Sequence, residues 1–194
     1  MRSWAEHYRF CCGNKPQLEG NIAHLSDFIV ELARHLKMGD SALEIGTGSG
    51  SLCAPIAQAG IRVVTLDNEP LILEQAKINA RVLGVKLEFV LGEALKLPFQ
   101  DDSFALSWSH GLIEHFSDVE IPVFVAEHLR VAPVAVIGMP LLGCTDGEHG
   151  DERFLPIAWW IEKLKDLGMV KHFVHNEGTL AFFTMARKGK ANAG

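Results

Sequence analysis

The chain has 194 residues, 48% of them hydrophobic and 22% charged, which suits one compact domain and disfavours a second full one. Its formal charge is -6, with acidic and basic residues intermixed, so it offers no basic surface for nucleic acid. It contains neither an apolar run of about 18 residues nor a signal-peptide region, so we expect a cytoplasmic protein without a membrane partner. The four cysteines (Cys11, Cys12, Cys53 and Cys144) have no zinc or disulfide spacing, and we expect reduced thiols.

Hydrophobic periodicity predicts helices and strands in alternation. In chain order they are a helix over residues 22–36, a strand over 42–45, a helix over 52–59, a strand over 62–66, a helix over 70–83, strands over 86–91 and 104–109, a helix over 121–131, a strand over 134–139, a helix over 157–167, and a hairpin of strands 169–175 and 179–186. The alternation predicts parallel β-α-β winding. We therefore expect an α/β, Rossmann-like, seven-stranded and mostly parallel sheet, with a C-terminal antiparallel hairpin and helices on both faces.

The sharpest local feature is the glycine-rich segment 43–50, which reads Leu-Glu-Ile-Gly-Thr-Gly-Ser-Gly between a predicted strand and a predicted helix. Glycines let a backbone turn sharply and approach a ligand closely. Seventeen residues after Gly50 the second strand ends in Asp67, where an acidic partner for ribose hydroxyls belongs. Together these features favour a nucleoside-binding site over a turn that serves only packing. The G-x-G-x-G spacing differs from the G-x-G-x-x-G of dinucleotide-binding folds.

The sequence resembles class I S-adenosylmethionine-dependent methyltransferases in four ordered segments. These are residues 43–50, residues 65–70, residues 92–94 together with 97–99, and residues 111–116. The resemblance covers about residues 41–187 and includes the closing antiparallel strand. It implies an N-terminal helical segment over 1–40 that caps the active site, a methyltransferase core over 41–187, and a polar tail over 188–194.

The resemblance implies S-adenosyl-L-methionine as the cofactor and assigns residues to its parts. Those lining the methionine part would be Glu44, Gly46, Thr47, Gly48 and Gly50. Asp67 would hold the ribose hydroxyls, Asn68 would flank the adenine, Glu93 and Ala94 would lie near the adenine amino group, and Ser109 would lie beneath the cofactor. For Asp67 and Glu93, the alternative is that they are solvated acids in turns.

The activity implied is methyl transfer to an oxygen, nitrogen or carbon atom of a small-molecule acceptor. Alignment and desolvation can carry most of the rate, and a base is needed only if the acceptor arrives protonated. The candidates are His110, which we favour as a histidine poised near neutral pH, followed by Glu114, His115, His149 and Asp151. A structural role is the alternative for each histidine. Metal-using members of the family carry a glutamate where this chain has Gly111, so we expect no metal.

The acceptor pocket should come from the N-terminal segment and the glycine-containing loop 140–156, which is long enough for a lid. Aromatic candidates for it are Trp4, His7, Tyr8, Phe10, Phe154, Trp159 and Trp160. Packing onto the sheet is the alternative role for these side chains. The acidic loop indicates a neutral or cationic acceptor, or simply a solvated face.

Two other classes of function share part of this pattern. A nicotinamide-dependent oxidoreductase would also have the glycine turn and the ribose acid, but the glycine spacing argues against it. A non-catalytic, partner-binding module on the same fold would be expected to have a broken glycine loop, and here the loop is intact. Either a monomer or a homodimer is compatible with the sequence.

Overall fold

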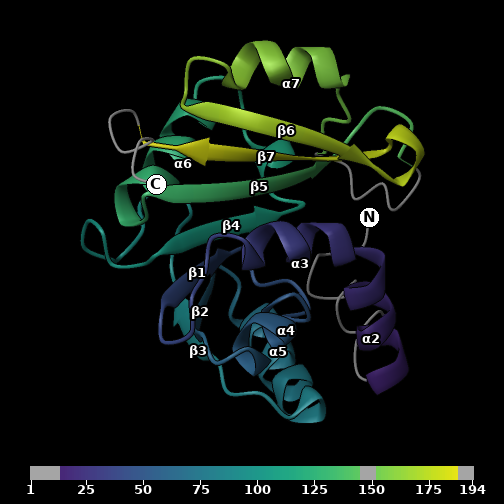
Figure 1. Cartoon of the computed structure of the whole chain (residues 1–194), viewed down its shortest axis with the longest axis vertical. Helices are drawn as coiled ribbons and strands as arrows, with labels where there is room; N and C mark the ends of the chain where they lie inside the picture. The colour runs from purple at the N-terminus through teal and green to yellow at the C-terminus, as the bar shows by residue number, and fades with distance from the viewer. Residues whose placement is uncertain (1–13, 145–151, 188–194) are drawn as a thin grey trace.

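The computed structural model describes residues 14–144 and 152–187. Its centre is a seven-stranded sheet in the order β3-β2-β1-β4-β5-β7-β6, which runs from bottom to top in Figure 1. The strands are β1 (Ser41–Ile45), β2 (Arg62–Asp67), β3 (Glu88–Leu91), β4 (Leu106–His110), β5 (Val134–Pro140), β6 (Met169–His175) and β7 (Leu180–Ala186). The first five pair in parallel, and β7 is antiparallel to both β5 and β6. The predicted fold class is confirmed.

The helices are α2 (Lys15–His24), α3 (Ser26–Ala33), α4 (Cys53–Gln58), α5 (Pro70–Leu83), α6 (Ile121–Val131) and α7 (Ile157–Leu164), with short 3-10 turns η1 (Ile113–His115) and η2 (Asn176–Gly178). The prediction of one helix over 22–36 is wrong, because two helices meet at Leu25. The first begins early because the Asn14 side chain caps it by accepting the Gln17 N–H at 3.0 Å. Only Leu18 of α2 is buried, so that helix has no apolar stripe for periodicity to detect. In the part of the chain described, no helix has both the length and the apolar character to cross a bilayer.

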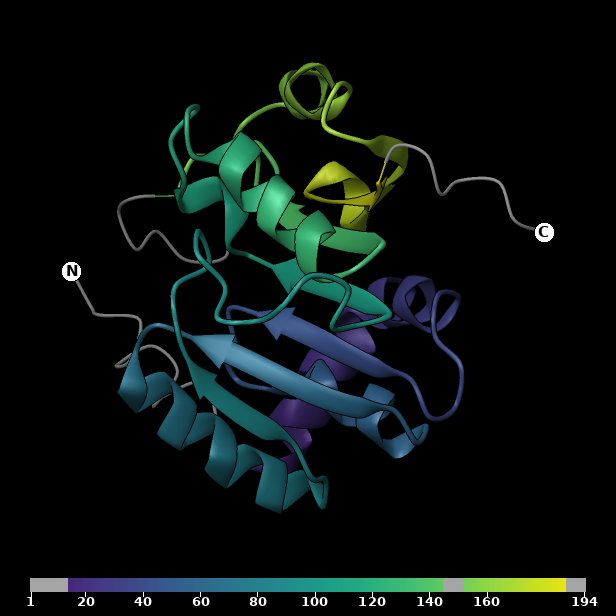
Figure 2. The ribbon, with the colours of Figure 1, turned by 90° about the vertical axis from the view of Figure 1, so that its left-hand side faces the viewer.

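The sheet carries a hydrophobic core on each face. Against α3 and α4 the core contains Phe28, Leu32, Ile56, Trp108 and Val136. Against α6 and α7 it contains Ile45, Phe124, Ile137, Trp160 and Phe183. Figure 2 shows α6 in green and the N-terminal helices in purple on opposite sides of the strands. Because α3 belongs to the core, the N-terminal helices do more than cover an active site; their capping role stays a prediction.

The strand order places β1 between β2 and β4, so the chain leaves β1 toward one edge of the sheet and later returns to its other side. In open parallel sheets, ligands bind outside the carboxyl ends of the strands at such a reversal point. The segments that follow β1, β2 and β4 meet there. They are three of the segments singled out in the sequence.

Candidate functional site

The turn after β1 is a loop whose three glycines have left-handed backbone angles, with φ of 81° at Gly46, 49° at Gly48 and 69° at Gly50. Other residues rarely adopt this conformation. The Gly46 N–H donates to the Leu66 carbonyl at 2.8 Å, and the Gly50 N–H closes the turn onto the Thr47 carbonyl at 2.8 Å. We call residues 46–50 the glycine loop. Its glycines are required by the turn itself, whatever the loop binds.

Glu44 lies beneath the glycine loop in a buried polar network and is only 3% exposed. Its carboxylate accepts hydrogen bonds from Thr65 Oγ1 at 2.8 Å, Cys53 Sγ at 2.9 Å and Trp108 Nε1 at 3.2 Å. The Thr47 hydroxyl joins the network through Thr65, at 2.7 Å. Burial raises the pKa of Glu44 to about 7, against the opposing effect of these donors. The side chains of Glu44 and Thr47 therefore face the protein interior, which leaves the loop backbone as the surface for a ligand.

Asp67 ends β2 beside the glycine loop and is 8% exposed. Its carboxylate accepts the Glu69 N–H at 3.0 Å, and the backbone amides of Thr47, Gly48 and Asn68 favour its charged form. Burial raises the pKa of Asp67, and the backbone donors oppose that shift. The structure thus brings the predicted ribose acid directly against the predicted loop.

The predicted adenine side is assembled from the ends of β2 and β3. Asn68 Nδ2 donates to Glu93 Oε2 at 3.4 Å, and the Gly92 N–H donates to the Asp67 carbonyl at 3.0 Å. Ala94 is half-buried against the core. The residues we assigned to the ribose and the adenine therefore lie together, although their sequence positions are about 26 residues apart.

His110 ends β4, and its ring packs edge-on against Phe28 of α3 with centroids 5.3 Å apart. Its partner on β5 is Gly138, where an added Cβ would lie 2.5 Å from the imidazole ring. Burial, with a smaller contribution from His24, lowers the pKa of His110 to about 4. This direction favours the neutral ring and argues against a His110 that titrates near neutral pH.

Known proteins match this chain in sequence and in fold. A family model described as a methyltransferase domain matches residues 42–133. The chain is 42% identical over 69 residues to the ribosomal protein L11 methyltransferase of Thermus thermophilus (35% of this chain, 27% of that protein). It is 33% identical over 130 residues to the norajmaline N-methyltransferase of Rauvolfia serpentina (62% and 44%). An S-adenosylmethionine-dependent methyltransferase from Aquifex aeolicus superposes with a TM-score of 0.75 at 17% identity, covering 95% of this chain and 98% of that one.

Residues 42–133 match a methyltransferase domain, and the fold is that of S-adenosylmethionine-dependent methyltransferases. The two curated relatives are matched over less than half of their own lengths. The domain match argues against the oxidoreductase alternative, since the glycine turn and the ribose acid that it shares occur here in a methyltransferase domain.

The remaining predicted site residues lie at the end of β4 and in the segment after it. Ser109 is fully buried, and its hydroxyl has no hydrogen-bond partner among the residues described. Glu114 and His115 form most of η1, where Glu114 is buried. His149 and Asp151 lie outside the described residues. His110 at the end of β4 and the pair Glu114 and His115 in η1 therefore lie on one short stretch of chain.

Arg153 ties the end of the predicted lid loop to η1. Its backbone N–H donates to the Glu114 carbonyl at 3.2 Å. Its guanidinium bonds the Phe116 carbonyl and, at 2.7 Å, the Asp118 carboxylate. Residues 152–156 are thus fixed to the predicted catalytic segment.

The aromatic residues proposed for the acceptor pocket have different positions. Trp160 is fully buried in the core, so the packing alternative is correct for it. Trp159 lies under the cations of Arg153 and Lys163, 5.4 and 5.8 Å from the ring centroid. Phe154 is half-buried. The others (Trp4, His7, Tyr8 and Phe10) and Cys11 and Cys12 lie outside the described residues. Within that described part, no group of His, Cys, Asp and Glu side chains could hold a metal ion, and Cys53 and Cys144 are free thiols.

Sequence reasoning missed the residues that support the loop from inside the protein. Asn79 on α5 is fully buried and donates from Nδ2 to the Ser49 carbonyl at 2.9 Å. Its signal is a polar residue on the buried face of an amphipathic helix. Thr65 and Trp108, which hold Glu44, gave no signal because threonine and tryptophan are common residues in strands.

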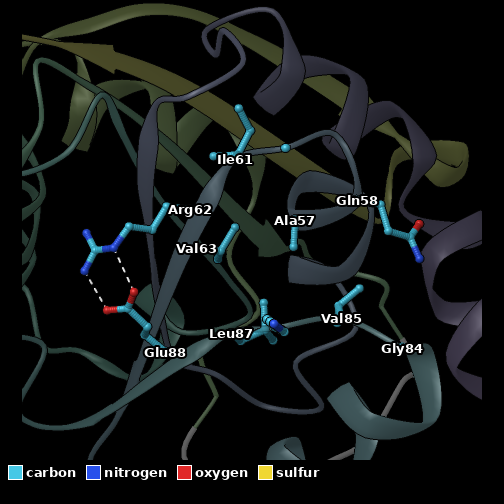
Figure 3. A pocket seen from close by; sticks show the side chains of 11 residues that line it. Ala57, Gln58, Ile61, Arg62, Val63, Gly84, Val85, Leu87 and Glu88 are labelled. Carbon is cyan, nitrogen blue, oxygen red and sulfur yellow. Dashed lines mark hydrogen bonds and ion pairs between the residues drawn. The ribbon is translucent and has the colours of Figure 1, made fainter.

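A cavity of about 770 Å³ lies at the opposite end of the sheet, where β2 and β3 begin. Figure 3 shows its apolar lining from Ile61, Val63 and Leu87. The Arg62–Glu88 ion pair, 2.7 Å between Nε and Oε1, lies at its side. This cavity is separate from the glycine loop, because it adjoins the amino ends of the strands.

Proposed function

We propose that this chain binds S-adenosyl-L-methionine and transfers its methyl group to a small-molecule acceptor through oxygen, nitrogen or carbon. The observation that carries the proposal is the contact between the glycine loop and Asp67 at the reversal point of the sheet. When bound, the cofactor supplies an activated methyl group on a sulfonium. The fold and the domain match support this function over other uses of the turn.

The residues present fit such a cofactor. The backbone of the glycine loop would hold the methionine part, with Glu44 fixing the loop from beneath. Asp67 would accept hydrogen bonds from the ribose hydroxyls beside the one that it now accepts from the Glu69 N–H. Asn68, Glu93 and Ala94 would flank the adenine, and Ser109 would support the end of β4.

For the transfer step, the chain must align the acceptor and exclude water. A neutral His110 can accept a hydrogen bond from an acceptor O–H or N–H. With a pKa of about 4 it is a weak base, so it is suited to orienting an acceptor that is already nucleophilic. Glu114 and His115 are the further candidates for proton transfer, and no metal is invoked.

A small-molecule acceptor is supported by the more extensive of the two sequence matches. The norajmaline N-methyltransferase match covers 62% of this chain, against 35% for the ribosomal protein L11 methyltransferase. The net charge of -6 disfavours nucleic acid as the acceptor. We further propose that the protein works in the cytoplasm, as a monomer or homodimer.

The test is a screen with S-adenosylmethionine labelled in the methyl group, using amine, phenol, alcohol and carbon-acid acceptors with ribosomal protein as a comparison. We expect S-adenosylhomocysteine release with at least one small molecule. Asp67→Ala should lower cofactor affinity on the order of tenfold or more, because it removes charge-assisted hydrogen bonds. Asp166→Ala, at an exposed site, should not.

His110→Ala should bind cofactor normally and lose turnover. Unchanged turnover in this variant would remove His110 from the mechanism. Cofactor binding without transfer to any acceptor in the screen would favour the non-catalytic module, and transfer to ribosomal protein alone would contradict the small-molecule acceptor.

A further inference from the structure

Helix α5 contacts the glycine loop from the interior at two successive turns. At Gly50, an added Cβ would lie 3.3 Å from the Ala76 side chain, so helix and loop touch there. One turn further along, Asn79 Nδ2 donates to the Ser49 carbonyl at 2.9 Å. Ser49 stands between Gly48 and Gly50, both of which have positive φ. The hydrogen bond therefore joins a rigid helix to the most freely turning part of the loop.

The amide of Asn79 is held in one orientation. Its Oδ1 accepts a hydrogen bond from Gln75 Nε2 at 3.2 Å, one helical turn earlier, which directs the Nδ2 donors toward Ser49. Asn79 is 0% exposed, and the other buried residues of α5 are apolar: Ile72, Leu73, Ala76 and Ala80. Burying an amide among such residues is unfavourable unless its hydrogen bonds are made. If position 79 served only packing, an apolar residue would be sufficient there.

The same helix begins next to the proposed ribose acid. Glu69 caps α5 by accepting the Leu71 N–H at 3.3 Å, and its own N–H donates to Asp67. The backbone amides of Thr47 and Gly48 in turn stabilise the charge of the Asp67 carboxylate. The glycine loop is thus held at its start by Asp67 and at its end by Asn79. Because one helix connects the two contacts, the distance between them is fixed.

We propose that Asn79 is a positioning residue of the cofactor site, which sets the backbone of Gly48 and Gly50 relative to Asp67. A loop with three glycines has wide conformational freedom, and each binding event would have to restrict it. A loop that is already ordered binds its ligand with less entropy loss. The ligand in this inference rests on the proposed function; the anchoring of the loop does not.

The anchoring is tested without any ligand by amide hydrogen exchange. We compare the wild type with Asn79→Ala, with the similarly sized Asn79→Leu, which has no donor for the Ser49 carbonyl, and with Leu164→Ala. Leu164 is fully buried on α7, at the opposite end of the molecule from α5 (Figure 1), so its variant loses stability without touching the loop. We expect faster exchange at Gly50, whose N–H closes the turn, in both Asn79 variants and not in Leu164→Ala. Equal exchange in the Asn79 variants and the wild type would overturn the anchoring.

The consequence for binding is tested by titration with S-adenosylhomocysteine, well below the lowest Tm of the set. We expect affinity to fall on the order of tenfold in both Asn79 variants and to be unchanged in Leu164→Ala. Wild-type affinity in the Asn79 variants, or an equal loss in Leu164→Ala, would overturn the positioning role. If the wild type itself does not bind, the proposed function fails, and the exchange experiment still decides the anchoring.

Discussion

Glu44 shows how a single buried residue couples the site to stability. Its pKa rises from an ordinary value of 4.5 to about 7 because burial disfavours the charged form. Since the folded-state pKa is the higher one, the stabilisation is fully present below pH 4.5 and is lost as pH rises through about 7. The shift corresponds to about 3 kcal/mol of folding free energy across that window.

We therefore expect Glu44→Gln to remove this part of the pH dependence. The glutamine has nearly the same shape and stays neutral, so its stability relative to the wild type should be greater at pH 8 than at pH 5. Urea unfolding of both proteins at several pH values measures the difference. Parallel pH profiles for the two proteins would contradict the assignment.

At the scale of elements, the pairing of β4 with β5 fixes the place of the candidate catalytic histidine. The His110 ring lies over Gly138 and against Phe28, so three elements enclose it. Gly138→Ala should displace the ring and destabilise the protein by about 1–3 kcal/mol, the usual cost of overpacking. Gly20→Ala is the matched control, since a methyl group there meets nothing within 4 Å and alanine favours a helix. In chemical denaturation, Gly138→Ala should lower the free energy of unfolding and Gly20→Ala should raise it. An unchanged free energy of unfolding in Gly138→Ala would show that the His110 ring has room to move.

Some of these elements could be predicted closely from local signals. The bounds of α5 and α6 match the predicted ranges, because a proline marks each start and Gly84 ends the former. Helix α2 was missed because its start depends on the Asn14 cap and its residues are mostly polar. The support of the glycine loop was also missed, because Asn79 and Ser49 are 30 residues apart and only the fold brings them together. The order of the segments and the glycine loop could be predicted from local sequence. The contacts that hold the loop could not, because they join residues far apart in the chain.

At the scale of the whole molecule, the candidate site lies where the strand order reverses, between β1 and β4. Strands β1, β2 and β4 end there: the glycine loop follows β1, and Asp67 and His110 are the last residues of β2 and β4. The acceptor side was less predictable, because it depends on packing between distant segments. Trp160 illustrates this: a residue suggested for the pocket is instead part of the core.

The central claim is that this site binds S-adenosylmethionine, and calorimetric titration of the wild-type chain with S-adenosylhomocysteine tests it without knowledge of the acceptor. NADH serves as the control ligand, because a nicotinamide-dependent enzyme would share the glycine turn and the ribose acid. We expect saturable one-to-one binding of S-adenosylhomocysteine and none of NADH. Binding of NADH alone, or of neither ligand, would contradict the account.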